Sequence, residues 1–288
     1  MNRINVRQFA AMLLIGDVFS LLCITGETTL VTAAGFTGAA AIELLLLLPL
    51  ALYYRRGHKP GRAAGILLLV FIVLWLAGIF RMMWRISDVI YASSENGGGL
   101  LGKAAVTGLI LLVCVYSVSA GIKALGRASL IAAALGALCI LIVTLYSLRH
   151  HDWESLSRTG GELSAGGELL RGIRAGGGIA GAAVLLGMTG GDHVRNICVY
   201  VALKVAVTAA VLITAIMILG GIMPMAEFPV LMAVQLSQPF PAQRIDALFL
   251  TAFSVYAVFT AAVQSAAAVY LIKDLTSGRT AKRRCCGA

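Results

Sequence analysis

The sequence predicts an all-α polytopic membrane protein, a single domain over residues 1–288 with about eight transmembrane helices. Hydrophobic residues make up 59% of the chain, and charged residues make up only 12%. The mean hydropathy of +0.91 lies outside the range of soluble domains. Apolar runs long enough to cross a bilayer alternate with short polar connections, which is the pattern of a helical membrane bundle.

The first apolar segment, from Arg7 to Thr25, carries a Gly16-Asp17 pair near its middle. A charged side chain at the bilayer centre costs about 2.5–3.5 kcal/mol, so it usually faces a cavity or a partner. Gly16 supplies flexibility and Asp17 supplies charge, which predicts a broken helix that lines a ligand cavity. The alternative is that Asp17 pairs with a basic side chain of a neighbouring helix and only fixes the packing.

The second and third apolar runs extend over about Phe36–Tyr54 and Ala63–Ala92. Three charged residues in the later part of the third run, Arg81, Arg85 and Asp88, are spaced four and three residues apart. That spacing places them on one helix face, where they could pair. Alternatively, they extend to the outer membrane interface, where their charges stay in water.

Further helices are expected over about Ala104–Ala120 and Leu130–Leu148, joined by a short basic connector. The sixth segment, Gly176–Gly191, is rich in glycine and short for a spanning helix. Short, glycine-interrupted segments are typical of broken transporter helices, which predicts a second break near Met188, Thr189 and Gly190. Close helix packing through small residues is the competing explanation.

A seventh helix is expected over about Asn196–Leu219, with Lys204 close enough to the cytosolic side for its ammonium group to reach water. Prolines bound the next region, Met225–Pro241, and predict a short surface helix there. The eighth helix is expected to begin near Arg244 and to end near Ile272.

The net charge of +10 comes from basic residues that stand mostly at the ends of the apolar runs. Their distribution over an eight-helix arrangement favours both termini in the cytosol, and it makes a nucleic-acid partner unnecessary. The adjacent His150 and His151 lack a third ligand at metal-binding spacing and are expected to be solvated. We expect no metal, no cofactor and no enzymatic activity, since no nucleophile and base lie at matching depth.

Three stretches of the chain resemble the endospore germination permeases, the B subunits of spore nutrient-germinant receptors. This family belongs to the amino acid–polyamine–organocation superfamily. The resemblance is spread in the right order over nearly the whole chain. Its residues are the polar lead Asn5–Phe9, the connector Tyr116–Ala128, and Phe228-Pro229 followed by Gln243–Leu248.

The resemblance implies a five-plus-five inverted-repeat (LeuT-like) bundle that lacks its last two helices, since the family usually has ten. It also implies a subunit that binds a small nutrient, an amino acid, and signals to A-type and C-type receptor subunits in the cell or spore inner membrane. The ligand is expected between the breaks in helices one and six. The predicted site residues are Gly16, Asp17, Met188, Thr189 and Gly190. An autonomous amino-acid transporter is the alternative function.

Overall fold

The structure is a computed structural model that describes residues 4–57, 61–91, 100–150, 164–176, 178–237 and 246–285. Within these ranges the chain is helical, and its only β contact is an isolated parallel bridge between Ile4 and Thr189. The helices are α1 Val6–Leu22, α2 Leu30–Arg55, α3 Arg62–Tyr91, α4 Leu100–Ala120, α5 Ile122–His150, α7 Ala165–Ala175, α8 Ile179–Leu186, α9 His193–Leu219, η1 Gly220–Met225, α10 Pro229–Leu236 and α11 Asp246–Cys285.

Five helices of the described chain are long and apolar enough to cross a membrane: α2, α3, α5, α9 and α11. The bent pair of α7 and α8, which meet at 50°, raises the number to six if it forms one span. The predicted polytopic, all-helical membrane fold is therefore confirmed. The arrangement of eight spans stays a prediction, because α1 has 17 residues and the apolar part of α4 covers only Thr107–Ala120.

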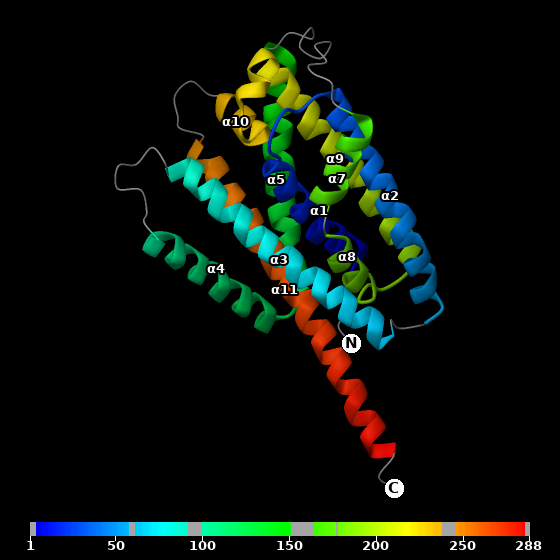
Figure 1. Ribbon diagram of the computed structural model, residues 1–288. Coiled ribbons are helices and arrows are strands. Elements are labelled where there is room, and N and C mark those ends of the chain that lie inside the picture. The colour runs from blue at the N-terminus through cyan, green and yellow to red at the C-terminus, as the bar shows by residue number, and fades with distance from the viewer. Residues whose placement is uncertain are drawn as a thin grey trace.

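The helix α1 lies in the middle of the bundle, as Figure 1 shows, and packs against α5, α9 and α11. Its side chains Phe9, Ile15 and Phe19 are buried in the main hydrophobic core. The helix α2 packs against α7 and α9, while α3 packs along α11, and α4 stands at the edge of the bundle. The most central helix is therefore the one that carries the Gly16-Asp17 pair.

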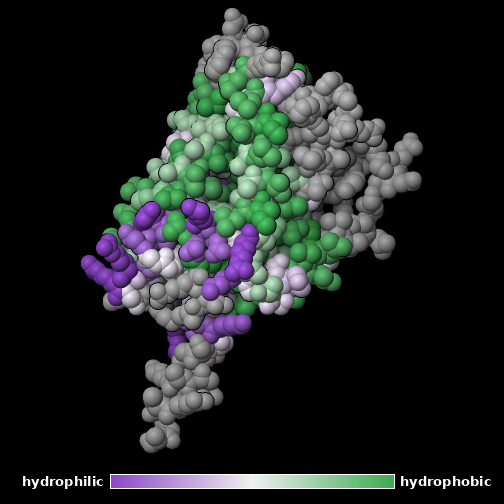
Figure 2. Space-filling view, turned by 180° about the vertical axis from the view of Figure 1, so that it is seen from behind, coloured by the Kyte–Doolittle hydropathy of each residue, from purple (hydrophilic) through white to green (hydrophobic). Residues whose placement is uncertain are grey.

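Both chain ends lie at the same end of the bundle in Figure 1. Figure 2 shows that the hydrophilic residues visible on one face gather towards this end, while most of the other coloured residues of this face are hydrophobic. A wide apolar surface with a polar end is the pattern expected of a bundle surrounded by lipid.

The expected break in the first helix is wrong, because α1 runs without interruption through Gly16 and Asp17. One glycine inside a helix costs only about 1 kcal/mol, and the buried side chains on both sides of Gly16 favour the continuous helix. A Cβ added at Gly16 would lie 3.5 Å from Thr260 Cγ2, so no wide gap opens beside this glycine. The Ser20 hydroxyl donates a hydrogen bond to the Gly16 carbonyl oxygen, which adds a further local contact.

Two other boundaries differ from the expected ones. The predicted connector between the fourth and fifth helices is almost entirely the beginning of α5. Only Gly121, with a φ of +91°, separates the two helices, because this left-handed conformation suits glycine alone. The short helix expected after Pro224 is α10, which begins at Pro229, but its side chains Val230, Leu231 and Ala233 are buried.

Candidate functional site

The candidate site is a buried cluster of four polar side chains contributed by α1, α2 and α9. Asp17 is 8% exposed, Glu43 3%, Lys204 7% and Tyr200 2%. Buried ionisable groups in a membrane bundle are costly unless they pair with one another. We call these four residues the charge cluster.

The ammonium group of Lys204 lies between the two carboxylates of the cluster. Its Nζ atom is 2.7 Å from Asp17 Oδ1 and 2.5 Å from Glu43 Oε2. The expectation that Lys204 extends towards the cytosolic side is therefore wrong. Because α9 packs against both α1 and α2, two carboxylates are within reach of the ammonium group, and pairing with them compensates its burial.

Tyr200 precedes Lys204 by one helical turn and therefore shares its face of α9. The Tyr200 hydroxyl lies 2.8 Å from Asp17 Oδ2 and 3.1 Å from Glu43 Oε1. A phenol has one proton to donate, so it donates to one carboxylate at a time. The ring of Phe9 packs edge-on against the Tyr200 ring, with 6.1 Å between the centroids. The tyrosine is thus fixed by packing and presents its hydroxyl to the carboxylates.

The charges of the cluster do not balance. When Asp17 and Glu43 are both ionised, one ammonium group faces two carboxylates, and the cluster carries a net charge of −1. Such an excess charge in a low-dielectric interior favours uptake of a proton or of a positively charged group. The cluster can therefore bind a cationic ligand group or a proton.

A small cavity borders the cluster. Asp17, Glu43 and Lys204 line it together with Ser20 and Thr208, and its volume is about 30 Å³. A water molecule needs roughly 10–15 Å³ of such space, so the cavity holds two or three waters or a small ligand group. A second, smaller cavity between α1 and α11 contains Asp17, Gly16 and Tyr200 in its wall. Asp17 therefore borders both cavities, whereas Glu43 borders only the first.

Gln264 of α11 lines the second cavity and is 4% exposed. Its Oε1 atom is buried and has no hydrogen-bond partner among the described residues. A buried acceptor without a partner costs about 1–3 kcal/mol. A donor group that entered the second cavity could satisfy this amide oxygen and a carboxylate of Asp17.

The predicted site residues separate into two groups. Gly16 and Asp17 lie at the charge cluster, whereas Met188, Thr189 and Gly190 follow the end of α8 and lie beside the N-terminal residues. The Ile4 N–H donates to the Met188 carbonyl oxygen at 3.2 Å, and the Gly190 N–H donates to the Ile4 carbonyl oxygen at 3.1 Å. Because α1 rises about 1.5 Å per residue, Asp17 lies roughly 16 Å along the helix from its start.

The geometry therefore leaves Met188–Gly190 outside the site, although the segment is non-helical as expected. The Met188 carbonyl and the Gly190 N–H are already paired with Ile4, and the Thr189 hydroxyl donates to the Leu186 carbonyl oxygen. The segment also precedes Asp192, whose side chain accepts a hydrogen bond from the Val194 N–H and caps α9. Its observed role is to connect α8 to α9.

Glu43 and Tyr200 are functional candidates that the sequence reasoning missed. For Glu43 a signal was present, since it is the only charged residue of the expected run from Phe36 to Tyr54. An intramembrane carboxylate is by default a functional-site hypothesis, and two of them predict a shared partner. Tyr200 offered no comparable signal, because tyrosine is common in membrane helices.

Other predicted features have less bearing on the site. Arg85 pairs with Glu227, with 3.0 Å between Nη2 and Oε1, while the side chain of Asp88 lies outside the described residues. The side chains of His150 and His151 also lie outside that part of the chain. Within the described chain, no group of three or more metal-binding side chains occurs.

Comparison with known proteins adds no assignment to this geometry. No protein-family model, no curated protein and no solved structure matches the chain.

Proposed function

We propose that the chain is a permease-like membrane subunit that binds a small nutrient through an ammonium group at the charge cluster. The observation that carries the proposal is the pairing of one buried ammonium group, Lys204, with two buried carboxylates, Asp17 and Glu43. Charges inside a membrane bundle usually mark a substrate or ion pathway. An amino acid supplies the positive group that this cluster lacks.

The cluster retains hydrogen-bonding capacity for such a ligand. Lys204 donates a hydrogen bond to one oxygen of each carboxylate, and the Tyr200 hydroxyl donates to the second oxygen of either Asp17 or Glu43. A carboxylate offers about four acceptor positions, so roughly half of them remain open. Gln264 Oε1 adds another open acceptor beside Asp17. A ligand ammonium group can therefore bind without displacing Lys204.

The resemblance to the endospore germination permeases supports a receptor subunit, with A-type and C-type subunits as partners. It also supports an inverted-repeat bundle in the cell membrane or spore inner membrane. Sensing requires a ligand site and a partner, whereas transport requires an alternating-access cycle between two bundles.

Both termini are placed in the cytosol under this proposal. The basic residues Arg7, Arg55, Arg62 and Arg195 are exposed. They stand at helix ends near the two termini, which supports this orientation.

The orientation can be tested with single cysteines in a cysteine-free background. Under the proposal, Ser157→Cys reacts with an impermeant thiol reagent added to intact cells, and Ser277→Cys reacts only after the cells are opened. Ser157 lies outside the described residues, and Ser277 follows the apolar part of α11. Labelling of Ser277→Cys in intact cells would reject the orientation.

Ligand binding can be tested by removing one carboxylate charge at a time. In Asp17→Asn or Glu43→Gln, the remaining carboxylate is balanced by Lys204, and the excess negative charge disappears. Because a hydrogen bond to a charged group contributes about 1.5–3 kcal/mol, we expect amino-acid affinity to fall about tenfold or more. Equilibrium binding of radiolabelled standard amino acids to the purified protein measures this.

A matched control separates binding from stability. Asp274→Asn removes a carboxylate of α11 that is only partly buried and does not belong to the cluster. Its affinity should stay within about twofold of that of the unaltered protein. The binding proposal fails if Asp17→Asn and Glu43→Gln lower the melting temperature but the folded fraction binds normally.

An autonomous amino-acid transporter is the second candidate. The observation that favours it is a large cavity next to the cluster cavity, with Ser20, Phe36 and Ala175 in the walls of both. A route from a wide cavity to a buried charged site is what a transport pathway requires. Uptake by the isolated chain distinguishes this function from the receptor.

A further inference from the structure

Four arginines from two helices surround one cavity beside the charge cluster. The cavity has a volume of about 480 Å³, within the range of roughly 300–1,000 Å³ that is typical of small-molecule sites. Arg81 and Arg85 come from α3, and Arg171 and Arg174 come from α7. Among the described residues, no acidic side chain lines the cavity. We call it the arginine vestibule.

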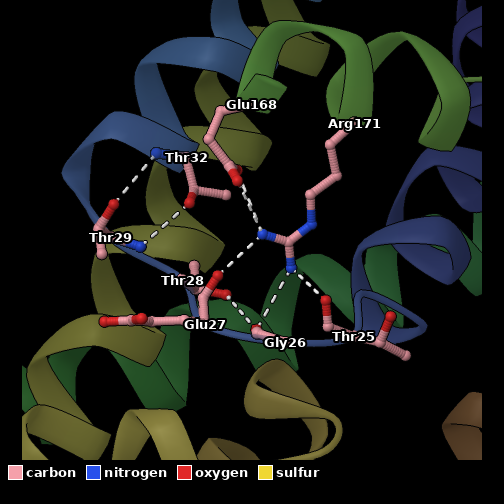
Figure 3. A network of polar contacts seen from close by, with 8 residues as sticks. All are labelled: Thr25, Gly26, Glu27, Thr28, Thr29, Thr32, Glu168 and Arg171. Carbon is pink, nitrogen blue, oxygen red and sulfur yellow. Dashed lines mark hydrogen bonds and ion pairs between the residues drawn. The ribbon is translucent and has the colours of Figure 1, made fainter. Parts of the chain in front are cut away.

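Arg171 is already committed to the protein. Figure 3 shows its guanidinium group between Glu168 and the connector from α1 to α2. The group pairs with Glu168 at 3.2 Å and donates to the carbonyl oxygens of Thr25, Gly26 and Glu27. Its charge is therefore balanced, and its role is to attach α7 to this connector.

Arg85 is also balanced. Its Nη2 atom lies 3.0 Å from Glu227 Oε1, and its guanidinium group lies over the ring of Phe228 at 6.0 Å from the centroid. These contacts hold the Arg85 side chain against the segment before α10.

Arg81 and Arg174 differ from the other two. Both are exposed, and neither has an ion-pair partner among the residues that the structure describes. They belong to different helices but line the same cavity, so one anion can attract both. Two guanidinium groups are well suited to carboxylate or phosphate oxygens, which they bind through paired N–H donors.

The remaining wall of the vestibule is largely apolar. Trp75, Ile79 and Met82 of α3 line it together with Phe19 of α1 and Phe36 of α2. An apolar wall excludes water and strengthens the attraction between an anion and the arginines. The same wall gains free energy by burying an apolar ligand body, at about 25 cal/mol per Å².

We infer that the arginine vestibule binds an anionic group, carboxylate or phosphate, that is attached to an apolar body. Arg81 and Arg174 hold the anionic oxygens, while Trp75 and its apolar neighbours contact the body. This site goes beyond the proposed function, because the charge cluster attracts a positive group and the vestibule attracts a negative one. The anion can come from a soluble organic acid or from the headgroup of an anionic lipid.

Tryptophan fluorescence can report binding directly. The chain contains three tryptophans, Trp75, Trp84 and Trp153, and Trp75 lines the vestibule. A Trp84→Phe, Trp153→Phe variant keeps Trp75 as the sole reporter. In nanodiscs of phosphatidylcholine, titration with benzoate should change the Trp75 emission saturably, whereas benzamide, its neutral analogue, should not.

The arginines are tested in the same background. A double glutamine variant, with both Arg81→Gln and Arg174→Gln, should weaken benzoate binding about tenfold or more, since two charge-assisted contacts are lost. Arg81→Lys keeps the charge but lacks the paired N–H donors, so it should weaken benzoate binding less than the double glutamine variant does. Arg62→Gln is the matched control, because Arg62 belongs to the same helix but lies about 28 Å away from Arg81 along it. Its benzoate affinity should be unchanged.

A second set of nanodiscs distinguishes the two sources of the anion. If a lipid headgroup occupies the vestibule, phosphatidylglycerol should change the Trp75 emission and compete with benzoate, and both effects should disappear in the double glutamine variant. If only soluble anions enter, phosphatidylglycerol should have no effect. Failure of both ligands to alter Trp75 emission would overturn the inference. The inference would also be overturned if the double glutamine variant bound benzoate as tightly as the unaltered protein. If the double variant folds poorly, Arg81→Lys provides the test, because it keeps the charge.

Discussion

Replacement of Lys204 by methionine is expected to destabilise the protein by about 3–5 kcal/mol, the cost typical of removing one partner of a buried ion pair. The change leaves two buried carboxylates, Asp17 and Glu43, hydrogen-bonded to the same Tyr200 hydroxyl and without a compensating cation. Thermal unfolding of the purified variant in detergent measures the effect, and a low yield of folded protein would accompany it.

The number of charges that each variant leaves in the cluster defines the controls for this prediction. Glu43→Gln leaves one carboxylate with one ammonium group and should change the unfolding free energy by no more than about 1 kcal/mol. Combining Lys204→Met with Asp17→Asn and Glu43→Gln removes every charge and should recover much of the loss. The account of the cluster is wrong if Lys204→Met is no more harmful than Glu43→Gln.

The second large effect is expected at Gly35, where α2 meets α7. A Cβ added to Gly35 would lie 2.7 Å from the backbone carbon of Glu168, closer than atoms can approach without a backbone shift. Overpacking of this kind costs about 1–3 kcal/mol. Gly35→Ala should therefore lower the melting temperature. It should also loosen the contact between Arg171 and the connector from α1 to α2, because Arg171 and Glu168 both belong to α7.

Two further substitutions define the specificity of this effect. Gly172→Ala tests the same interface from α7, since its added Cβ would lie 2.9 Å from the Ala39 Cβ. Gly108→Ala is the control, because nothing lies within 4 Å of a Cβ added there. It should leave stability unchanged or raise it slightly, as alanine favours helix over glycine. Equal melting temperatures for Gly35→Ala and Gly108→Ala would show that α2 and α7 are not closely packed.

The sequence predicted the helices well because long apolar runs leave few alternatives to helix in a membrane. It failed at Gly16, where composition suggested a break and the structure keeps α1 continuous. A single glycine only permits a break, and whether one forms depends on the helices packed around it. Such tertiary contacts, here with α5, α9 and α11, are not visible in a local pattern.

The site was predicted only in part for a similar reason. The unusual depth of Asp17 was visible in the sequence, and the alternative that it pairs with a basic side chain of a neighbouring helix agrees with its contact to Lys204. Lys204 was predicted to reach water at the cytosolic side because it lies close to the end of its helix. This distance says nothing about the direction of its side chain. Which faces of α2 and α9 meet α1 depends on helix rotation, and the sequence does not specify it.

The central claim, that the chain binds an amino acid at the charge cluster as a receptor subunit, is tested most directly on proteoliposomes that contain the purified chain alone. Binding and uptake of radiolabelled amino acids are measured on the same preparation, with and without an imposed ion gradient. The account predicts saturable binding that Glu43→Gln weakens about tenfold, without accumulation of the amino acid inside the liposomes. Concentrative uptake by the isolated chain would contradict the receptor function and establish a transporter.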